Sequence, residues 1–65
     1  MKTKVQFHIR HNGKFRLVET EMESEHPVVM DFEQFKEFRK KFNRVPRQLV
    51  YQDVHGEWWP VEFER

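Results

Sequence analysis

The stretch Asp31 to Asn43, with the sequence DFEQFKEFRKKFN, decides the fold of this chain. Its aromatic residues recur at intervals of three, three and four positions: Phe32, Phe35, Phe38 and Phe42. At about 100° per residue, their side chains fall within a stripe about 120° wide, which predicts an amphipathic helix. A helix of about 11 residues is too short to be stable alone in water, so it must pack against another element.

The sequence also predicts both ends of this helix. Asp31 is a good N-cap, and Gln34 follows three residues later, as in a capping box. Asn43 tolerates the left-handed conformation that closes a helix, and Pro46 lies just beyond it. We therefore expect the helix to begin after Asp31 and to end at about Asn43.

The length and composition of the chain indicate one small domain covering residues 1–65. Sixty-five residues are near the lower limit for folding without cross-links, and the chain has no cysteine. Disulfides and thiolate metal sites are therefore excluded. Seven Phe, two Trp and one Tyr supply enough large apolar side chains for a compact core.

The net charge and the apolar segments bear on location and partners. The net charge is only +1, so the composition does not indicate polybasic binding by the chain as a whole. No apolar run approaches the length of a membrane span, and the first 14 residues have no uninterrupted hydrophobic stretch. We expect a soluble cytoplasmic protein that does not contact a membrane.

Residues 3–10 alternate polar and apolar side chains, which predicts a half-buried strand. An Asn-Gly pair at positions 12–13 is a strong signal for a hairpin turn. A three-residue loop would put Ile9 opposite Phe15, whereas a two-residue turn would put Ile9 opposite Arg16. The three-residue loop is favoured here because it pairs an apolar residue with an apolar residue.

The C-terminal part of the chain predicts a second hairpin, whose loop is residues 54–56. That loop pairs Tyr51 with Trp59 and keeps apolar side chains on one face. Pro60 cannot donate a ladder hydrogen bond, so the last strand is expected at an edge of the sheet.

The predicted order is hairpin, helix, hairpin, or ββαββ, and the fold class is α+β. We expect a two-layer sandwich in which one amphipathic helix packs on a four-stranded, mainly antiparallel sheet. A 2-1-3-4 strand order would make the sheet wholly antiparallel, whereas placing the third strand beside the second would need a parallel crossover. Residues 28–30 are either a short extended entry to the helix or a short strand.

Residue types used in catalysis and metal binding are sparse. Ser24 is the sole serine, and there is no glycine-rich loop for phosphates. The paired carboxylates lie on predicted strand ends without a cleft, so we do not expect an enzyme or a cofactor. The histidines lack the spacing of a zinc signature, so no metal site is expected: His8, His11, His26 and His55.

Basic residues cluster at the end of the predicted helix and just after it: Lys36, Arg39, Lys40, Lys41, Arg44 and Arg47. One interpretation is that these bases complement the helix dipole, with acidic residues at the helix start. The other is that they contact the phosphates of a nucleic acid.

Trp58 and Trp59 are adjacent, so in a strand their side chains point to opposite faces. If Trp59 lies under the helix, Trp58 is exposed on the open face of the sheet. Exposed aromatic and aliphatic side chains beside arginine have the composition of an interface core. The residues predicted to bind a partner are Trp58, Arg10, Arg16, Val18, Val50, Gln52 and Val54.

These features favour a protein-binding module, such as a small inhibitor or adaptor of the kind encoded by phages, that covers part of a larger protein. Nucleic-acid binding is the alternative, with Trp58 stacking on a base and the basic cluster contacting phosphates. The chain is expected to be a monomer or a homodimer. The acidic alternation from Glu19 to Glu25 is either a charged strand edge or a docking strip for a basic partner.

Overall fold

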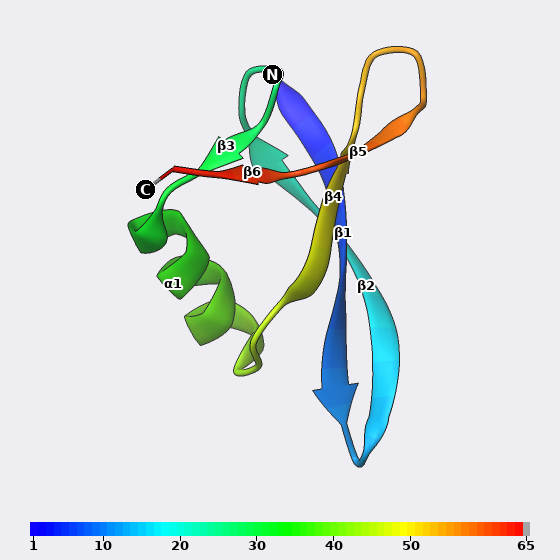
Figure 1. The fold of residues 1–65 in the computed structure, drawn as a ribbon, viewed down its shortest axis with the longest axis vertical. Helices are drawn as coiled ribbons and strands as arrows, with labels where there is room; N and C mark the ends of the chain where they lie inside the picture. Colours follow the sequence, from blue (N-terminus) through cyan, green and yellow to red (C-terminus); the bar gives the residue numbers. More distant parts are fainter. Residues whose placement is uncertain (65) are drawn as a thin grey trace.

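The computed structural model describes residues 1–64 and shows a four-stranded sheet with a helix packed against it (Figure 1). The elements in chain order are β1 (Lys2–His11), β2 (Lys14–Glu23), β3 (Val29–Met30), α1 (Phe32–Phe42), β4 (Arg47–Gln52), β5 (Trp58–Pro60) and β6 (Glu62–Phe63). The main sheet has the order β2-β1-β4-β5 and all its pairs are antiparallel. The predicted ββαββ arrangement is therefore confirmed. Of the two strand orders considered, the structure has the wholly antiparallel 2-1-3-4 order, in which β4 and β5 are the third and fourth strands.

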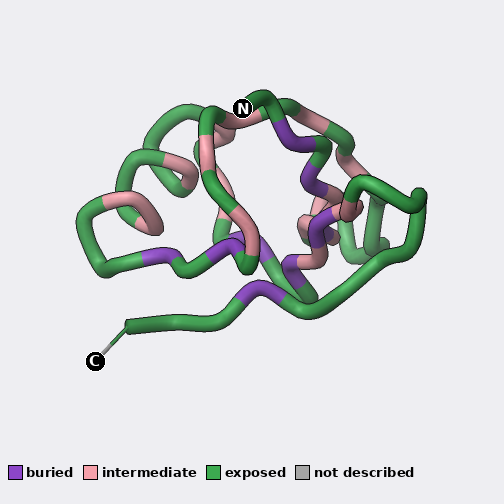
Figure 2. The backbone as a smooth tube through the Cα atoms, turned by 90° about the horizontal axis from the view of Figure 1, so that it is seen from above, coloured by how far each residue is buried: buried purple, intermediate pink, exposed green. Residues whose placement is uncertain are grey.

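The molecule has two layers, with its core between the sheet and α1. The buried residues, purple in Figure 2, lie on β1, on β3 and β4 and just before each of these two strands, and just before β6. The buried apolar residues form one cluster: Val5, Phe7, Val28, Met30, Leu49, Tyr51 and Val61. Phe7 lies at its centre, with its ring 5.0 Å from that of Phe42 and 5.9 Å from that of Phe38. The phenylalanine stripe thus covers the sheet as predicted.

The stripe is nevertheless shorter than its spacing indicates. Phe35, Phe38 and Phe42 pack against the core cluster, but Phe32 is 68% exposed. Phe32 is the first residue of α1 and therefore lies where the helix has just left β3. The first aromatic residue of the stripe is available at the surface.

Hydrogen bonds cap α1 as the sequence predicts. The backbone N–H of Gln34 donates to Asp31 Oδ1 (2.8 Å), and the backbone N–H of Asp31 donates to Gln34 Oε1 (3.0 Å). Asn43 closes the helix in the left-handed conformation, with φ of 54°. These bonds satisfy backbone donors that the first helical turn would otherwise leave without a partner.

Asp31→Ala is expected to lower the free energy of unfolding by about 1 kcal/mol, because it removes the N-cap acceptor. Urea denaturation followed by circular dichroism measures this change. Asp31→Asn is the matched control, since asparagine keeps a side-chain oxygen at the cap. Equal losses in the two variants would contradict a capping role for this side chain.

The first hairpin corrects the predicted loop. Asn12 and Gly13 both have positive φ, 52° and 76°, and form a two-residue turn that pairs His11 with Lys14. Ile9 is therefore opposite Arg16, so the expected pairing of Ile9 with Phe15 is wrong. A turn with two left-handed residues matches the twist of the strands, and this backbone preference outweighs apolar matching.

The register of this hairpin decides which side chains of β2 face the helix. Val18 is opposite the buried Phe7, and Val18 and Met22 pack against the core. Leu17 is opposite His8, so Phe15 and Leu17 lie on the other face of the sheet. The prediction that Val18 lies on the open face is therefore wrong.

The second hairpin has the predicted register, with Tyr51 opposite Trp59. Its loop is closed by a hydrogen bond from the Asp53 N–H to the Glu57 carbonyl (2.8 Å). Pro60 lies on β5, the edge strand, as predicted. The expected continuous last strand is divided, however, because β6 leaves the main sheet and pairs in parallel with β3.

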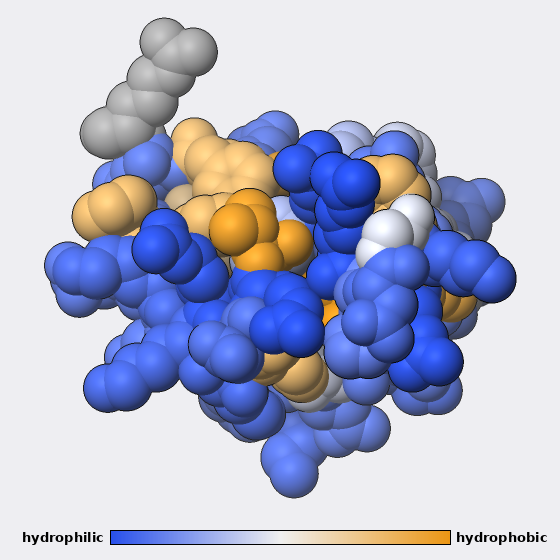
Figure 3. All heavy atoms as spheres, turned by 90° about the horizontal axis from the view of Figure 1, so that it is seen from below, coloured by the Kyte–Doolittle hydropathy of each residue, from blue (hydrophilic) through white to orange (hydrophobic). Residues whose placement is uncertain are grey.

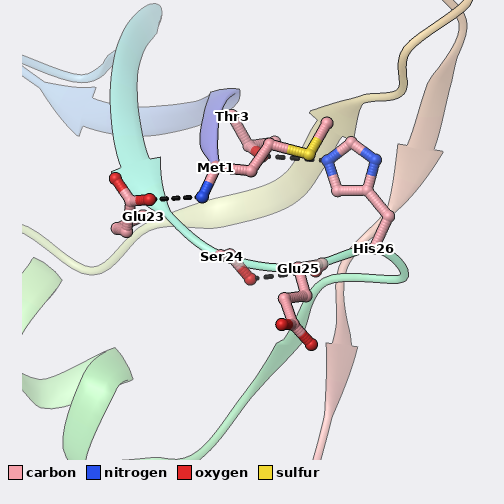
Figure 4. A network of polar contacts seen from close by, with 6 residues as sticks. All are labelled: Met1, Thr3, Glu23, Ser24, Glu25 and His26. Carbon is pink, nitrogen blue, oxygen red and sulfur yellow. Dashed lines mark hydrogen bonds and ion pairs between the residues drawn. The ribbon is translucent and has the colours of Figure 1, made fainter.

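A group of polar contacts joins the start of β1 to the segment between β2 and β3 (Figure 4). The buried Thr3 hydroxyl forms a hydrogen bond with His26 Nε2 (2.9 Å), and the N-terminal ammonium group binds the Glu23 carboxylate. The His26 ring also lies 5.2 Å from the ring of Tyr51. These contacts hold the β2–β3 connection against the core.

Candidate functional site

The candidate site is the face of the main sheet that is turned away from α1, called here the outer face. In Figures 1 and 2, α1 and the β3–β6 pair lie on one side of the sheet, and no element of residues 1–64 lies over the other. Strand alternation and the ladder pairs assign five apolar side chains to the outer face: Phe15, Leu17, Val50, Trp58 and Pro60. They form two groups: Phe15 and Leu17 lie on β2, and Val50, Pro60 and Trp58 lie on β4 and β5, with β1 between them.

Four of the residues predicted to bind a partner do lie on the outer face: Arg10, Val50, Gln52 and Trp58. Gln52 is directly opposite Trp58, and Val50 is opposite Pro60 on β5. The other three lie elsewhere. Arg16 and Val18 are on the helix side of β2, and Val54 is exposed in the β4–β5 loop. The structure therefore brings together one part of the predicted set.

Sequence reasoning missed Phe15 and Leu17, which are 60% and 57% exposed. They lie on β2, and their cross-strand partners on β1 are Arg10 and His8. The Asn-Gly pair could have predicted this placement, because a two-residue turn puts the side chains of Phe15 and Leu17 on the outer face. The apolar part of the outer face is thus larger than the sequence analysis predicts.

The two tryptophans lie on opposite faces, as predicted. Trp58 is on the outer face and is 38% exposed, whereas Trp59 shares the side of Tyr51 and is 48% exposed. Trp59 is therefore not a core residue. Its indole N–H donates to Asp53 Oδ2 (2.7 Å), which fixes the ring beside the β4–β5 loop.

Asp53 organises the β4–β5 loop that precedes Trp58. Its Oδ1 accepts hydrogen bonds from the backbone N–H groups of His55 and Glu57, each 2.9 Å long. The hydrogen bond from Trp59, followed by these backbone bonds, holds the pKa of the Asp53 carboxyl below its ordinary value. The ionised carboxylate is therefore the form that the loop stabilises.

This lowered pKa predicts that acid weakens the loop. With the folded-state pKa below the ordinary value of about 3.9, Asp53 contributes stability above that pH and loses it as the pH falls through the folded-state pKa. The stability advantage of the native protein over Asp53→Asn should therefore shrink as the pH falls from 6 to below 3. Urea unfolding at a series of pH values measures it. A constant difference across this range would contradict the role given to the carboxylate.

Acidic side chains lie on the outer face of β2, across β4 and β1 from Trp58. Glu21 and Glu23 are opposite Lys4 and Lys2, and Gln6 Nε2 donates to Glu19 (3.3 Å). These cross-strand pairs make this part of β1 and β2 polar. The apolar part of the outer face is therefore bounded by charge along β2.

The bases of the predicted cluster do not surround Trp58. Lys36 pairs with Glu33 on the exposed side of α1, and Arg44 contacts His11 Nδ1 (3.3 Å). Arg47 is at the start of β4, whereas Trp58 is opposite Gln52 at the end of that strand. A base stacked on Trp58 and phosphates bound by this basic cluster would therefore lie at opposite ends of β4.

Three structural findings bear on other kinds of site. Within residues 1–64, no three His, Asp or Glu side chains gather closely enough to hold a metal ion. The helix in this part of the chain is too short and too polar to cross a membrane. On the helix side, an apolar groove of about 560 Å³ is lined by Phe32, Phe35, Pro46, Gln48, Leu49, Phe63 and Glu64.

Comparison of this chain with protein-family models, with curated proteins and with solved structures gives no match.

Proposed function

We propose that this protein is a non-enzymatic protein-binding module, a small inhibitor or adaptor that covers part of a larger protein with its outer face. The observation that carries the proposal is the outer face itself, which holds five apolar side chains with no element of residues 1–64 over them. Burial of such a surface by a partner is favourable in proportion to the apolar area removed from water.

The kinds of residue on the outer face suit a protein partner. Trp58 offers a large, rigid side chain, and tryptophan is prominent among residues that dominate binding energy. Val50 and Pro60 lie beside it as aliphatic neighbours, and Gln52 adds a polar group. Arg10 provides a charged residue near the margin, which suits the polar rim of an interface.

The edge of the sheet beside Trp58 favours docking on the face over addition of a strand. Val61 N–H donates to the Leu49 carbonyl and Asp53 N–H to the Glu57 carbonyl, so alternation leaves Pro60 at a position whose nitrogen points away from β4. Without an N–H, that position cannot pair with an incoming strand. A partner at this end of the sheet would therefore contact side chains.

Affinity capture tests the proposal. The tagged protein is incubated with a lysate of its native host, with and without nuclease, and bound proteins are identified by mass spectrometry. We expect one dominant protein that survives nuclease and moderate salt and is lost when Trp58→Ala replaces the native bait. Equal capture by the native and Trp58→Ala baits would contradict binding through the outer face.

A further inference from the structure

Positive charge is concentrated in two segments that are far apart in the sequence. Residues 8–18 and 38–48 contain eight of the 12 Lys and Arg residues and no acidic residue. The eight are Arg10, Lys14, Arg16, Arg39, Lys40, Lys41, Arg44 and Arg47. The remaining bases share the rest of the chain with all 11 acidic residues, so the net charge of +1 hides a strong separation of charge.

The fold brings these two segments to one end of the molecule, called here the basic end. The Arg44 guanidinium lies 3.3 Å from His11 Nδ1, and Arg47 is opposite His8 in the β1–β4 ladder. Figure 3 looks at the molecule from this end and shows strongly hydrophilic side chains around a few apolar ones. Such an arrangement attracts a polyanion at low salt.

A hollow opens where the basic end meets the outer face. It has a volume of about 550 Å³ and is lined by His8, Phe15, Arg47 and Gln48. The Arg47 guanidinium carbon lies 5.8 Å from the centre of the exposed Phe15 ring. The Nδ1 atom of His8 is buried and has no hydrogen-bond partner among the described residues. The hollow thus offers a flat aromatic surface and a flat cation, with His8 in its lining.

We propose that the basic end binds single-stranded nucleic acid, with one base in the hollow and neighbouring phosphates on the surrounding Arg and Lys side chains. Phe15 and the Arg47 guanidinium provide planar surfaces on which a base stacks. This site shares Phe15 with the outer face of the proposed function but does not include Trp58, so variants of Phe15 and of Trp58 test the two proposals separately.

A single strand suits the site better than a duplex. The bases of a duplex are stacked on one another, so none of them can enter the hollow without being unstacked. The exposed side of α1 also carries the acidic residues Glu33 and Glu37 between its Lys and Arg side chains. These two carboxylates would repel the phosphates of a duplex laid along the helix. The hollow therefore favours unpaired bases.

Fluorescence anisotropy with a labelled 12-nucleotide oligothymidylate tests this proposal, with a duplex of equal length for comparison. We expect tighter binding of the single strand, weakening as salt is raised. If about four Lys or Arg side chains contact phosphates, the slope of the logarithm of the binding constant against the logarithm of the salt concentration should be about −3. Phe15→Ala should weaken binding roughly tenfold or more through lost stacking. Arg47→Ala should also make the salt slope shallower by about 0.7.

Two matched controls define the site. Lys36→Ala removes a basic residue outside the two acid-free segments, and Trp58→Ala removes the aromatic residue of β5 that is opposite Gln52. Both variants should bind the oligonucleotide as the native protein does. Phe15→Leu keeps an apolar side chain without the aromatic face, so it tests stacking even if Phe15→Ala is less stable.

Four results would overturn the proposal: no binding at 50 mM salt, preference for the duplex, native affinity in both Phe15 variants, or equal binding of polyglutamate. The last would show general attraction to polyanions. Loss of protein capture by Trp58→Ala, with oligonucleotide binding intact, would leave this proposal standing beside the proposed function.

Discussion

Phe7→Ala is expected to leave the domain largely unfolded at room temperature. Phe7 is fully buried, and its ring contacts those of Phe38 and Phe42, so it joins the sheet to α1. Truncation of a buried phenylalanine to alanine costs about 3–5 kcal/mol. A single core in a domain of this length rarely supplies more than about 3–5 kcal/mol of stability, so this loss removes most of it. Thermal and urea unfolding, followed by circular dichroism, measure the effect.

Phe32→Ala is the matched control, because it makes the same phenylalanine-to-alanine change at an exposed position. We expect its stability to stay within about 1 kcal/mol of the native value, as is usual for surface substitutions. If Phe7→Ala folded cooperatively with nearly native stability, α1 would not pack over the centre of β1 as the structure has it.

Trp58→Ala is expected to weaken binding of the captured protein partner by about 30-fold or more while leaving the domain folded. Loss of an anchoring tryptophan in an interface costs about 2 kcal/mol or more, and 1.4 kcal/mol is a factor of ten in Kd. The side chain lies on the outer face, away from the core cluster, so its removal should not disturb packing beneath α1. Titration calorimetry gives the affinity, and circular dichroism checks the fold.

Phe32→Ala again serves as the control, since it removes an exposed aromatic side chain from the opposite layer of the molecule. Its affinity for the partner should equal that of the native protein. Unfolding of Trp58→Ala would mean that this side chain supports the core, and native affinity in Trp58→Ala would place the interface elsewhere. Each result would contradict the outer face as the binding surface.

The helix could be predicted because every local signal in residues 31–43 agrees. The phenylalanine spacing, the Asp31 and Gln34 capping box and the left-handed Asn43 all concern interactions within a few residues. Local interactions of this kind are fixed by the sequence before tertiary contacts form. The ββαββ order followed from the same kind of signal, alternation on either side of two glycine-containing turns.

The first hairpin could not be predicted correctly from side-chain matching. Apolar pairing favoured a three-residue loop, but the backbone of Asn12 and Gly13 adopts the two-residue turn that strand twist prefers. A register shift of one residue reverses which side chains face the core. Phe15 and Leu17 were therefore missed as surface residues, and Val18 was assigned to the wrong face.

The split of the last strand and the basic end depend on contacts between distant parts of the chain. β6 pairs with β3 across more than 30 residues, and no local pattern in residues 58–63 specifies that partner. The acid-free segments are visible in the sequence, but their meeting depends on the Arg44–His11 contact and on the pairing of β1 with β4. The net charge of the chain does not reveal that the two acid-free segments meet at one end of the fold.

The most direct test of the outer face as the binding surface uses the two tryptophan indole N–H signals in a ¹⁵N-correlated NMR spectrum. Trp58 lies on the outer face, whereas the Trp59 indole N–H is bound to Asp53 on the other side of the same strand. On addition of the captured protein partner, the Trp58 signal should shift or broaden much more than the Trp59 signal. A response confined to Trp59 or to residues of α1, with Trp58 unchanged, would contradict binding through the outer face.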